Sequence, residues 1–139
     1  MHTIHEFRLT NRIAELTRMH EAVESLPLPP RTMFNTSLVL DELLTNIIKY
    51  GLPPQELREI YVRLELNEEH LDIVIEDDGI EFNPLEAPDP DLELPIEERP
   101  IGGLGIFIVR KLSSSFCYER VDGGNHLAVR MLMNNQEAT

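Results

Sequence analysis

Glu42 and Asn46 stand four residues apart in a mostly apolar stretch of the chain, residues 38–48. In an α-helix, with 3.6 residues per turn, this spacing places the carboxylate and the amide on one face. Both need partners, because an unpaired buried polar group costs about 1–3 kcal/mol. Glu42 could pair with Lys49, and Asn46 could bind a carbonyl group of the core. Alternatively the partner is a ligand, and the pair holds a hydrated metal ion and a reacting hydroxyl.

Two further segments break apolar runs, namely Asp78-Gly79 and Gly102-Gly103-Leu104-Gly105. The second segment suits a phosphate group, because glycines allow close backbone approach and a helix N-terminus presents free N–H groups to an anion. It is neither a P-loop nor a dinucleotide-binding fingerprint. Taken alone, the first segment is equally compatible with an ordinary turn and the second with a flexible hinge.

The elements that must position these residues follow from periodicity and from Pro and Gly punctuation. Asn11 is expected to cap a helix that ends before Pro27, and a second helix is expected over residues 31–50. Residues 80–100 are expected to form a long loop, followed by a short buried helix that ends near Leu112. Apolar residues alternate with polar ones in five expected strands, at residues 4–9, 60–66, 71–75, 116–121 and 127–133. This order predicts an α+β fold, a two-layer sandwich whose mixed, mostly antiparallel sheet carries helices on one face, in a single domain over residues 1–139.

The composition narrows the class of partner. The 139 residues carry a formal net charge of −13, which argues against binding to nucleic acid or to an anionic membrane surface and favours a partner protein with a basic face. Cys117 is the only cysteine, so no internal disulfide can form and a reducing, cytoplasmic location is expected. Its place between Phe116 and Tyr118 in a strand predicts a small buried residue.

In this order, the three segments together resemble the GHKL superfamily of ATP-binding domains, which have the Bergerat fold. Within it, they resemble most closely the bacterial anti-sigma factor serine/threonine-protein kinases. The resemblance spans the whole chain and rests on three motifs: Glu42-x-x-x-Asn46-x-x-Lys49-Tyr50-Gly51, Asp78-Gly79-Ile80-Glu81-Phe82-Asn83-Pro84, and residues 102–112, which begin Gly102-Gly103-Leu104-Gly105. Lys49 stands where the family often has His, and Asn83 where it usually has Asp.

The resemblance implies ATP and Mg²⁺ as cofactors and gives each residue a role. Glu42 would be the general base, and Asn46 the magnesium ligand. Asp78 would accept a hydrogen bond from the adenine amino group, with Gly79 allowing the base to approach. The remaining residues of the cofactor site would be Lys49, Gly102, Gly103, Leu104 and Gly105, covered by an ATP lid at about residues 80–101.

The implied function is phosphorylation of an anti-anti-sigma protein of the STAS type on Ser or Thr, together with sequestration of a sigma factor. A homodimer is also implied by the family. Two alternatives stay open. The chain could be a non-catalytic, nucleotide-gated anti-sigma or partner-binding module, or the detached ATP-binding domain of a histidine kinase.

Overall fold

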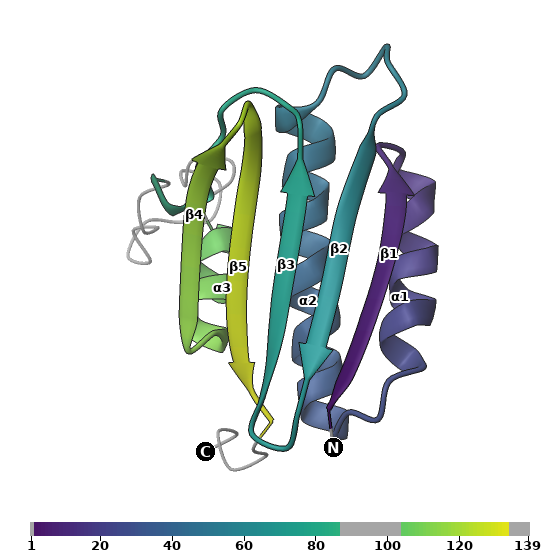
Figure 1. The fold of residues 1–139 in the computed structure, drawn as a ribbon, viewed down its shortest axis with the longest axis vertical. Coiled ribbons are helices and arrows are strands. Elements are labelled where there is room, and N and C mark those ends of the chain that lie inside the picture. The colour runs from purple at the N-terminus through teal and green to yellow at the C-terminus, as the bar shows by residue number, and fades with distance from the viewer. Residues whose placement is uncertain (1, 87–103, 134–139) are drawn as a thin grey trace, which may run out of the picture.

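A five-stranded sheet with helices packed on one face makes up the fold (Figure 1). The structure, a computed structural model, describes residues 2–86 and 104–133. In chain order the elements are β1 (Thr3–Thr10), η1 (Ile13–Glu15), α1 (Leu16–Glu24), α2 (Pro30–Asn46), η2 (Ile47–Gly51), β2 (Glu59–Leu66), β3 (His70–Asp77), η3 (Pro84–Glu86), α3 (Leu104–Leu112), β4 (Ser115–Val121) and β5 (Gly124–Leu132). The α+β class and the order of the expected elements are thereby confirmed.

The strand order in the sheet is β1-β2-β3-β5-β4, and each neighbouring pair is antiparallel. The expectation of a mixed sheet was therefore wrong for the described residues. The reason is topological: β2 and β3 form a hairpin, β4 and β5 form another, and β3 pairs with β5 rather than with β4. The second hairpin turns at Asp122 and Gly123, whose φ angles of 48° and 78° belong to the left-handed region that two-residue hairpin turns require.

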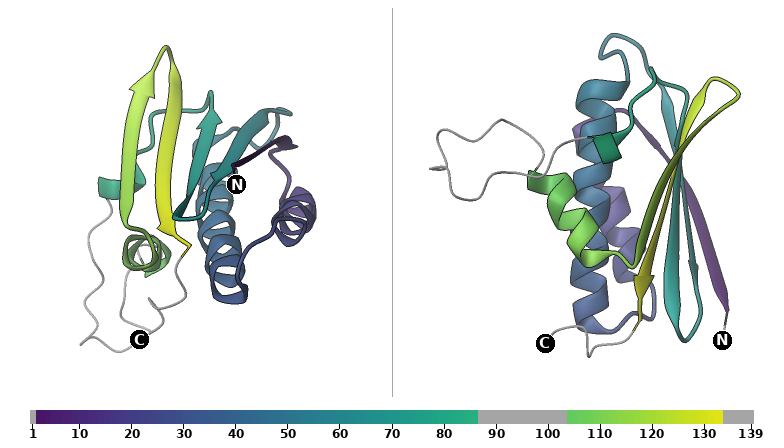
Figure 2. Two further views of the ribbon diagram at one scale, coloured as in Figure 1. Left: turned by 60° about the horizontal axis from the view of Figure 1, so that its bottom comes forward. Right: turned by 90° about the vertical axis from the view of Figure 1, so that its left-hand side faces the viewer.

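The core lies between the sheet and the helices. Every second residue of β3, from Leu71 through Ile73 to Ile75, is buried against the helical layer. Figure 2 shows α2 between α1 and α3 on that face. The α2 side chains Leu40, Leu43 and Leu44 are almost wholly buried. This central, well-packed helix carries both Glu42 and Asn46.

Asn11 does not cap a helix, contrary to the prediction. The first helical turn begins after Arg12 and has no side-chain cap, while Asn11 is buried against the loop that precedes β2. Its amide donates to the carbonyl groups of Pro53 (3.2 Å) and Glu56 (2.8 Å), and its oxygen accepts from the Arg58 N–H at 2.9 Å. The Asn11 side chain thus satisfies three backbone groups of this loop instead of capping a helix.

Cys117 was also predicted wrongly, because it is exposed. It lies on the outer face of β4, where alternate residues point away from the helices.

The expected ATP lid falls mostly on residues 87–103, which lie outside the described residues, as do Gly102 and Gly103. Within the described part of the chain, no helix is long and apolar enough to cross a membrane.

Candidate functional site

The helix formed by α2 and η2 presents two polar side chains for which the described part of the chain provides no partner. Glu42 and Asn46 are half-buried, one turn apart. Within residues 2–86 and 104–133, neither the Glu42 carboxylate nor the Asn46 amide makes a hydrogen bond or an ion pair. The alternatives considered from the sequence, a Glu42–Lys49 pair and an Asn46 bond to a core carbonyl, are thus not observed there. Lys49 is exposed on η2.

The start of α3 lies directly against Glu42. A methyl group at Gly105 would overlap the carboxylate of Glu42, so any side chain at this position would displace the acid. Leu104 is the first residue of α3. The structure thus brings the end of the glycine-rich segment to the carboxylate that was predicted to act beside it.

The other end of the same helix contacts the Asp78-Gly79 segment. The N–H group of Ile80 donates to the Gly51 carbonyl at 3.1 Å, and a methyl group at Gly79 would overlap that carbonyl oxygen. Residues 47–51 form a π-helical turn, a feature that often marks functional sites. Asn46 therefore lies on this helix between two contacts with other segments. On one side Glu42 contacts Gly105, and on the other side Gly51 contacts Gly79.

Asp77, rather than Asp78, is the buried carboxylate of this loop. Asp77 is 8% exposed, and its Oδ1 accepts from the Gly79 N–H at 2.8 Å and from the Asn125 amide at 3.0 Å. The Asp78 side chain is 69% exposed and pairs with Arg58 at 3.0 Å. Asp77 was not among the residues expected from the sequence, although the alternation of Leu71, Ile73 and Ile75 indicates it as the next inward residue. The role expected of Asp78 remains a prediction.

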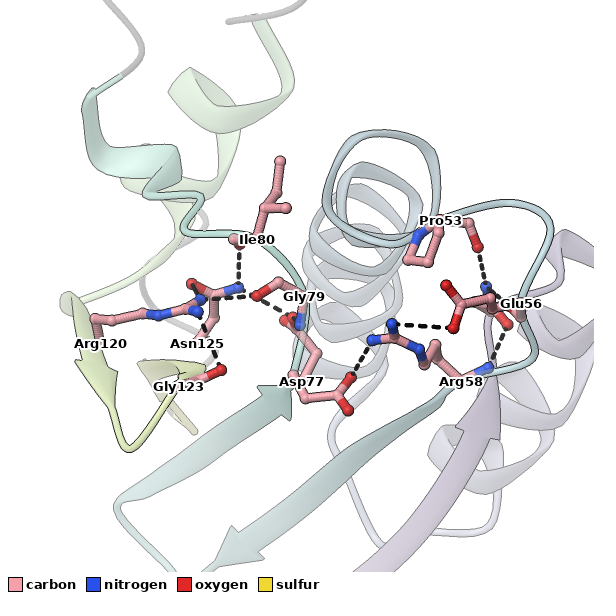
Figure 3. A network of polar contacts seen from close by, with 11 residues as sticks. Pro53, Glu56, Arg58, Asp77, Gly79, Ile80, Arg120, Gly123 and Asn125 are labelled. Carbon is pink, nitrogen blue, oxygen red and sulfur yellow. Dashed lines mark hydrogen bonds and ion pairs between the residues drawn. The ribbon is translucent and has the colours of Figure 1, made fainter.

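Asn125, which is 4% exposed, holds this region together (Figure 3). Its amide donates to Asp77 and also to the Ile80 carbonyl at 2.8 Å. Its oxygen accepts from the Tyr118 hydroxyl at 2.6 Å, from Arg120 at 3.1 Å and from the Phe82 N–H at 3.2 Å. Arg120 in turn donates to the Gly79 carbonyl at 2.8 Å. The loop after β3 is therefore held by a side chain of β5 that no sequence pattern indicated.

This environment changes the acidity of Asp77. Burial raises the pKa of its carboxyl group, and the neighbouring Asp78 carboxylate raises it further. Hydrogen bonds from Asn125 and Gly79, together with the positive charge of Arg120, offset part of that rise. Asp77 is thus a buried carboxylate with a perturbed pKa, a combination typical of functional sites.

A pocket of about 490 Å³ opens beside the contact between Gly51 and Gly79. Its size is within the range of small-molecule sites. The walls come from η2, the following loop, the Asp78-Gly79 segment and β4, with Tyr50, Leu52, Pro53, Arg58, Asp78, Ile80 and Arg120 among the lining residues. Glu42 and Asn46 do not line it, and lie further along the helix toward α3.

Comparison with known proteins agrees with this geometry. Residues 7–131 match a family model described as the histidine kinase-like ATPase domain. The chain is 29% identical over 99 residues to the serine/threonine-protein kinase BtrW of Bordetella bronchiseptica, an alignment that covers 71% of this chain and 70% of that protein. It is 24% identical over 108 residues to the serine-protein kinase RsbW of Bacillus mycoides, with 75% of this chain and 67% of RsbW covered.

A solved structure gives the same answer for the fold. The histidine kinase domain of the Erythrobacter litoralis EL346 blue-light activated histidine kinase superposes with a TM-score of 0.59 at 19% identity, over 91% of this chain and 67% of that domain. The resemblance inferred from the three motifs is thus confirmed, and the family model spans most of the described residues. The chain belongs to the histidine kinase-like ATPase domain family.

Proposed function

We propose that the chain is an ATP-dependent serine/threonine-protein kinase that phosphorylates an anti-anti-sigma protein of the STAS type and sequesters a sigma factor. One observation carries the catalytic part of the proposal. The Glu42 carboxylate lies one helical turn from Asn46 and against Gly105, and no described residue pairs with it. An acid in this position is available to a substrate.

The residues present fit Mg²⁺ and ATP. An unpaired amide oxygen at Asn46 suits a hard cation, which takes oxygen ligands and keeps several waters. Gly79 and Gly105 allow the Gly51 carbonyl group and the Glu42 carboxylate to approach the backbone closely, contacts that a Cβ atom would block. Bound Mg²⁺–ATP supplies the phosphoryl group and the charge that neutralises its transfer.

The chain's own residues then divide the work. Asn46 would hold the metal, and Gly105 allows the start of α3 to lie close to Glu42. Asp77, with its oxygen held by Gly79 and Asn125, accepts the hydrogen bond of the adenine amino group, the role that the sequence had suggested for Asp78. Glu42 accepts the proton of the attacking hydroxyl and orients it, which is the contribution that phosphoryl transfer asks of a protein side chain.

The names of the relatives and the net charge of the chain support the proposed kinds of partner. The relatives are named serine or serine/threonine kinases, which supports a protein hydroxyl as the acceptor. The net charge of −13 supports a basic surface on the sequestered partner. The sigma factor and the STAS-type substrate themselves come from the family resemblance.

A phosphotransfer assay tests the proposal. The full chain is incubated with Mg²⁺–ATP and the cognate STAS-type protein, and phosphoserine or phosphothreonine is located by mass spectrometry. We expect Glu42→Gln to keep ATP binding and to lose transfer by about 10²- to 10⁴-fold, the range for a general base. Asn46→Ala should lose ATP binding, whereas Glu24→Gln, an exposed acid on α1, should match the wild type.

The outcome also separates the alternatives. Equal transfer by wild type and Glu42→Gln would remove Glu42 from catalysis. Binding of the sigma factor without any transfer, unaffected by Asn46→Ala, would favour the partner-binding module. Phosphate on His20 of α1 in place of a partner serine would favour the histidine kinase reading.

A further inference from the structure

A second cavity lies at the opposite end of α2 from the proposed nucleotide site. It is enclosed by the first turns of α2, the end of α3 and the end of β5. Its polar lining residues are Arg31, Thr32, Asn35, Lys111, Ser113 and Ser114. Twenty residues of helix separate Arg31 from Gly51, or roughly 30 Å at 1.5 Å per residue, so the two sites are distinct.

The charge of this cavity is unusual for the chain. The sequence has 25 acidic and 12 basic residues, yet no Asp or Glu is among the lining residues of this cavity. Arg31 and Lys111 both line it, and neither forms an ion pair with any carboxylate of residues 2–86 or 104–133. Lys111 lies instead over the Phe107 ring, 5.2 Å from its centroid. Two cations without a carboxylate partner form an attractive field for an anion.

Thr32 gives an independent indication of a ligand. Its side chain lines the cavity and is 3% exposed. Its hydroxyl group makes no hydrogen bond with a described residue, and the hydroxyl oxygen is not closed off from solvent. Because the rest of the Thr32 side chain is buried and the residue lines the cavity, this hydroxyl group is open to a partner inside the cavity. Ser114, by contrast, already donates to the Arg130 carbonyl at 3.1 Å.

The size of the cavity limits what can enter. Its volume is about 120 Å³, room for about four waters at roughly 30 Å³ each. That is too small for a nucleoside and suits a single tetrahedral oxyanion. Guanidinium and ammonium groups together with hydroxyl donors are the groups that bind such an anion.

We propose that this cavity is a second anion site, which binds a phosphate-class oxyanion through Arg31, Lys111 and the Thr32 hydroxyl. The group can arrive as inorganic phosphate or as the phosphomonoester of a phosphoserine peptide. The proposal does not depend on the kinase function.

Backbone NMR of the full chain tests it. Inorganic phosphate should shift the amide resonances of Asn35, Ser113 and Ser114 in a saturable way, while chloride at equal ionic strength should not. Arg31→Gln or Lys111→Gln should weaken phosphate binding about tenfold, the value of one charge-assisted hydrogen bond. Thr32→Val, which keeps shape and removes the hydroxyl, should also weaken it. Arg12→Gln, an equal change of charge at an exposed arginine outside the cavity, should not.

Two further arms complete the experiment. A phosphoserine peptide that binds more tightly than phosphate, and loses binding on dephosphorylation, identifies the phosphomonoester as the ligand, whereas equal affinity identifies the free ion. Asn46→Ala should leave these shifts intact. Their loss in Asn46→Ala would assign them to the nucleotide site, and their absence in the wild type, or an equal effect of Arg12→Gln, would also overturn the proposal.

Discussion

At the scale of single residues, the negative charge of Asp77 has two opposing effects. It lowers the stability of the folded protein because it is buried, yet it suits the proposed contact with the adenine amino group. Burial raises its pKa above the ordinary value of 3.8, so the folded protein holds this proton more tightly than the unfolded chain does. Its contribution to the free energy of unfolding is therefore fully present below pH 3.8 and is lost as the pH rises through the folded pKa. At neutral pH the protein carries the cost of a buried charge.

The variant Asp77→Asn distinguishes the effect of this charge on stability from its effect on ATP binding. The amide oxygen of the variant can still accept hydrogen bonds from Gly79 and Asn125. The second carboxylate oxygen, however, is replaced by an NH₂ group, and this donor cannot accept a hydrogen bond from the adenine amino group. We expect the variant to equal or exceed the wild type in free energy of unfolding at pH 7, and the difference to shrink as the pH falls toward 4. Affinity for ATP should fall at least tenfold, or about 1.4 kcal/mol.

Urea denaturation from pH 4 to 8, with calorimetric titration of ATP, measures both quantities. Asp78→Asn is the matched control at an exposed carboxylate and should change neither by much. If Asp78→Asn abolished ATP binding and Asp77→Asn did not, the adenine contact would belong to Asp78, as the sequence first suggested.

The glycines that contact the helix give a second prediction. Gly105→Ala places a methyl group on the Glu42 carboxylate, which must move aside. Because this carboxylate is the far end of a flexible side chain, the variant should lose little stability but most of the phosphotransfer activity. Gly51→Ala is the control, because its Cβ would lie 3.9 Å from the nearest side-chain atom, on Ile47, an ordinary contact. Thermal unfolding and transfer rates check both, and unchanged transfer by Gly105→Ala would mean that Glu42 can move away without loss of activity.

At the scale of elements, the loop between η2 and β2 is held by a residue of another element. Asn11, just after β1, bonds to Pro53, Glu56 and Arg58 and so fixes one wall of the 490 Å³ pocket. Asn11→Asp distinguishes this role from helix capping. Asp is as good an N-cap as Asn, but it has no N–H group to donate to the Pro53 and Glu56 carbonyls.

We therefore expect Asn11→Asp to lower the free energy of unfolding by about 1–3 kcal/mol, because two hydrogen bonds worth about 0.5–1.5 kcal/mol each are lost. Chemical denaturation measures the change. Arg12→Ala, at the observed but uncapped helix start, should be close to neutral. An unchanged stability of Asn11→Asp would restore the capping interpretation.

At the scale of the whole molecule, the net charge of −13 governs encounter with partners. If a sigma factor with a basic face is the partner, its association rate should fall steeply as the salt concentration rises from about 0.05 to 0.5 M, because the Debye length shortens from more than 10 Å to a few Å. The dissociation rate should change less. Surface plasmon resonance or stopped-flow fluorescence gives both rates, and a salt-independent association rate would exclude a role for this field.

Much of this architecture was predictable because local patterns and global packing agree. The alternation in β2 and β3 and the apolar face of α2 each reflect burial against one layer. Asn11 and Cys117 were mispredicted because their surroundings come from distant chain segments, the loop before β2 and the free outer face of the sheet. Asn125 was missed because its five hydrogen bonds join parts of the chain more than 40 residues apart as well as near neighbours.

The edge strand β4 carries one exposed thiol to which a fluorescent dye can be attached. Cys117 is the chain's single cysteine and lies on the outer face of β4, in register with Ala128 of β5. A maleimide dye would therefore attach at one position, without prior removal of other thiols. Because that position is on the side of the sheet away from the helices, its fluorescence would report on a partner that covers the open sheet face and would be little changed by one that docks on the helical layer.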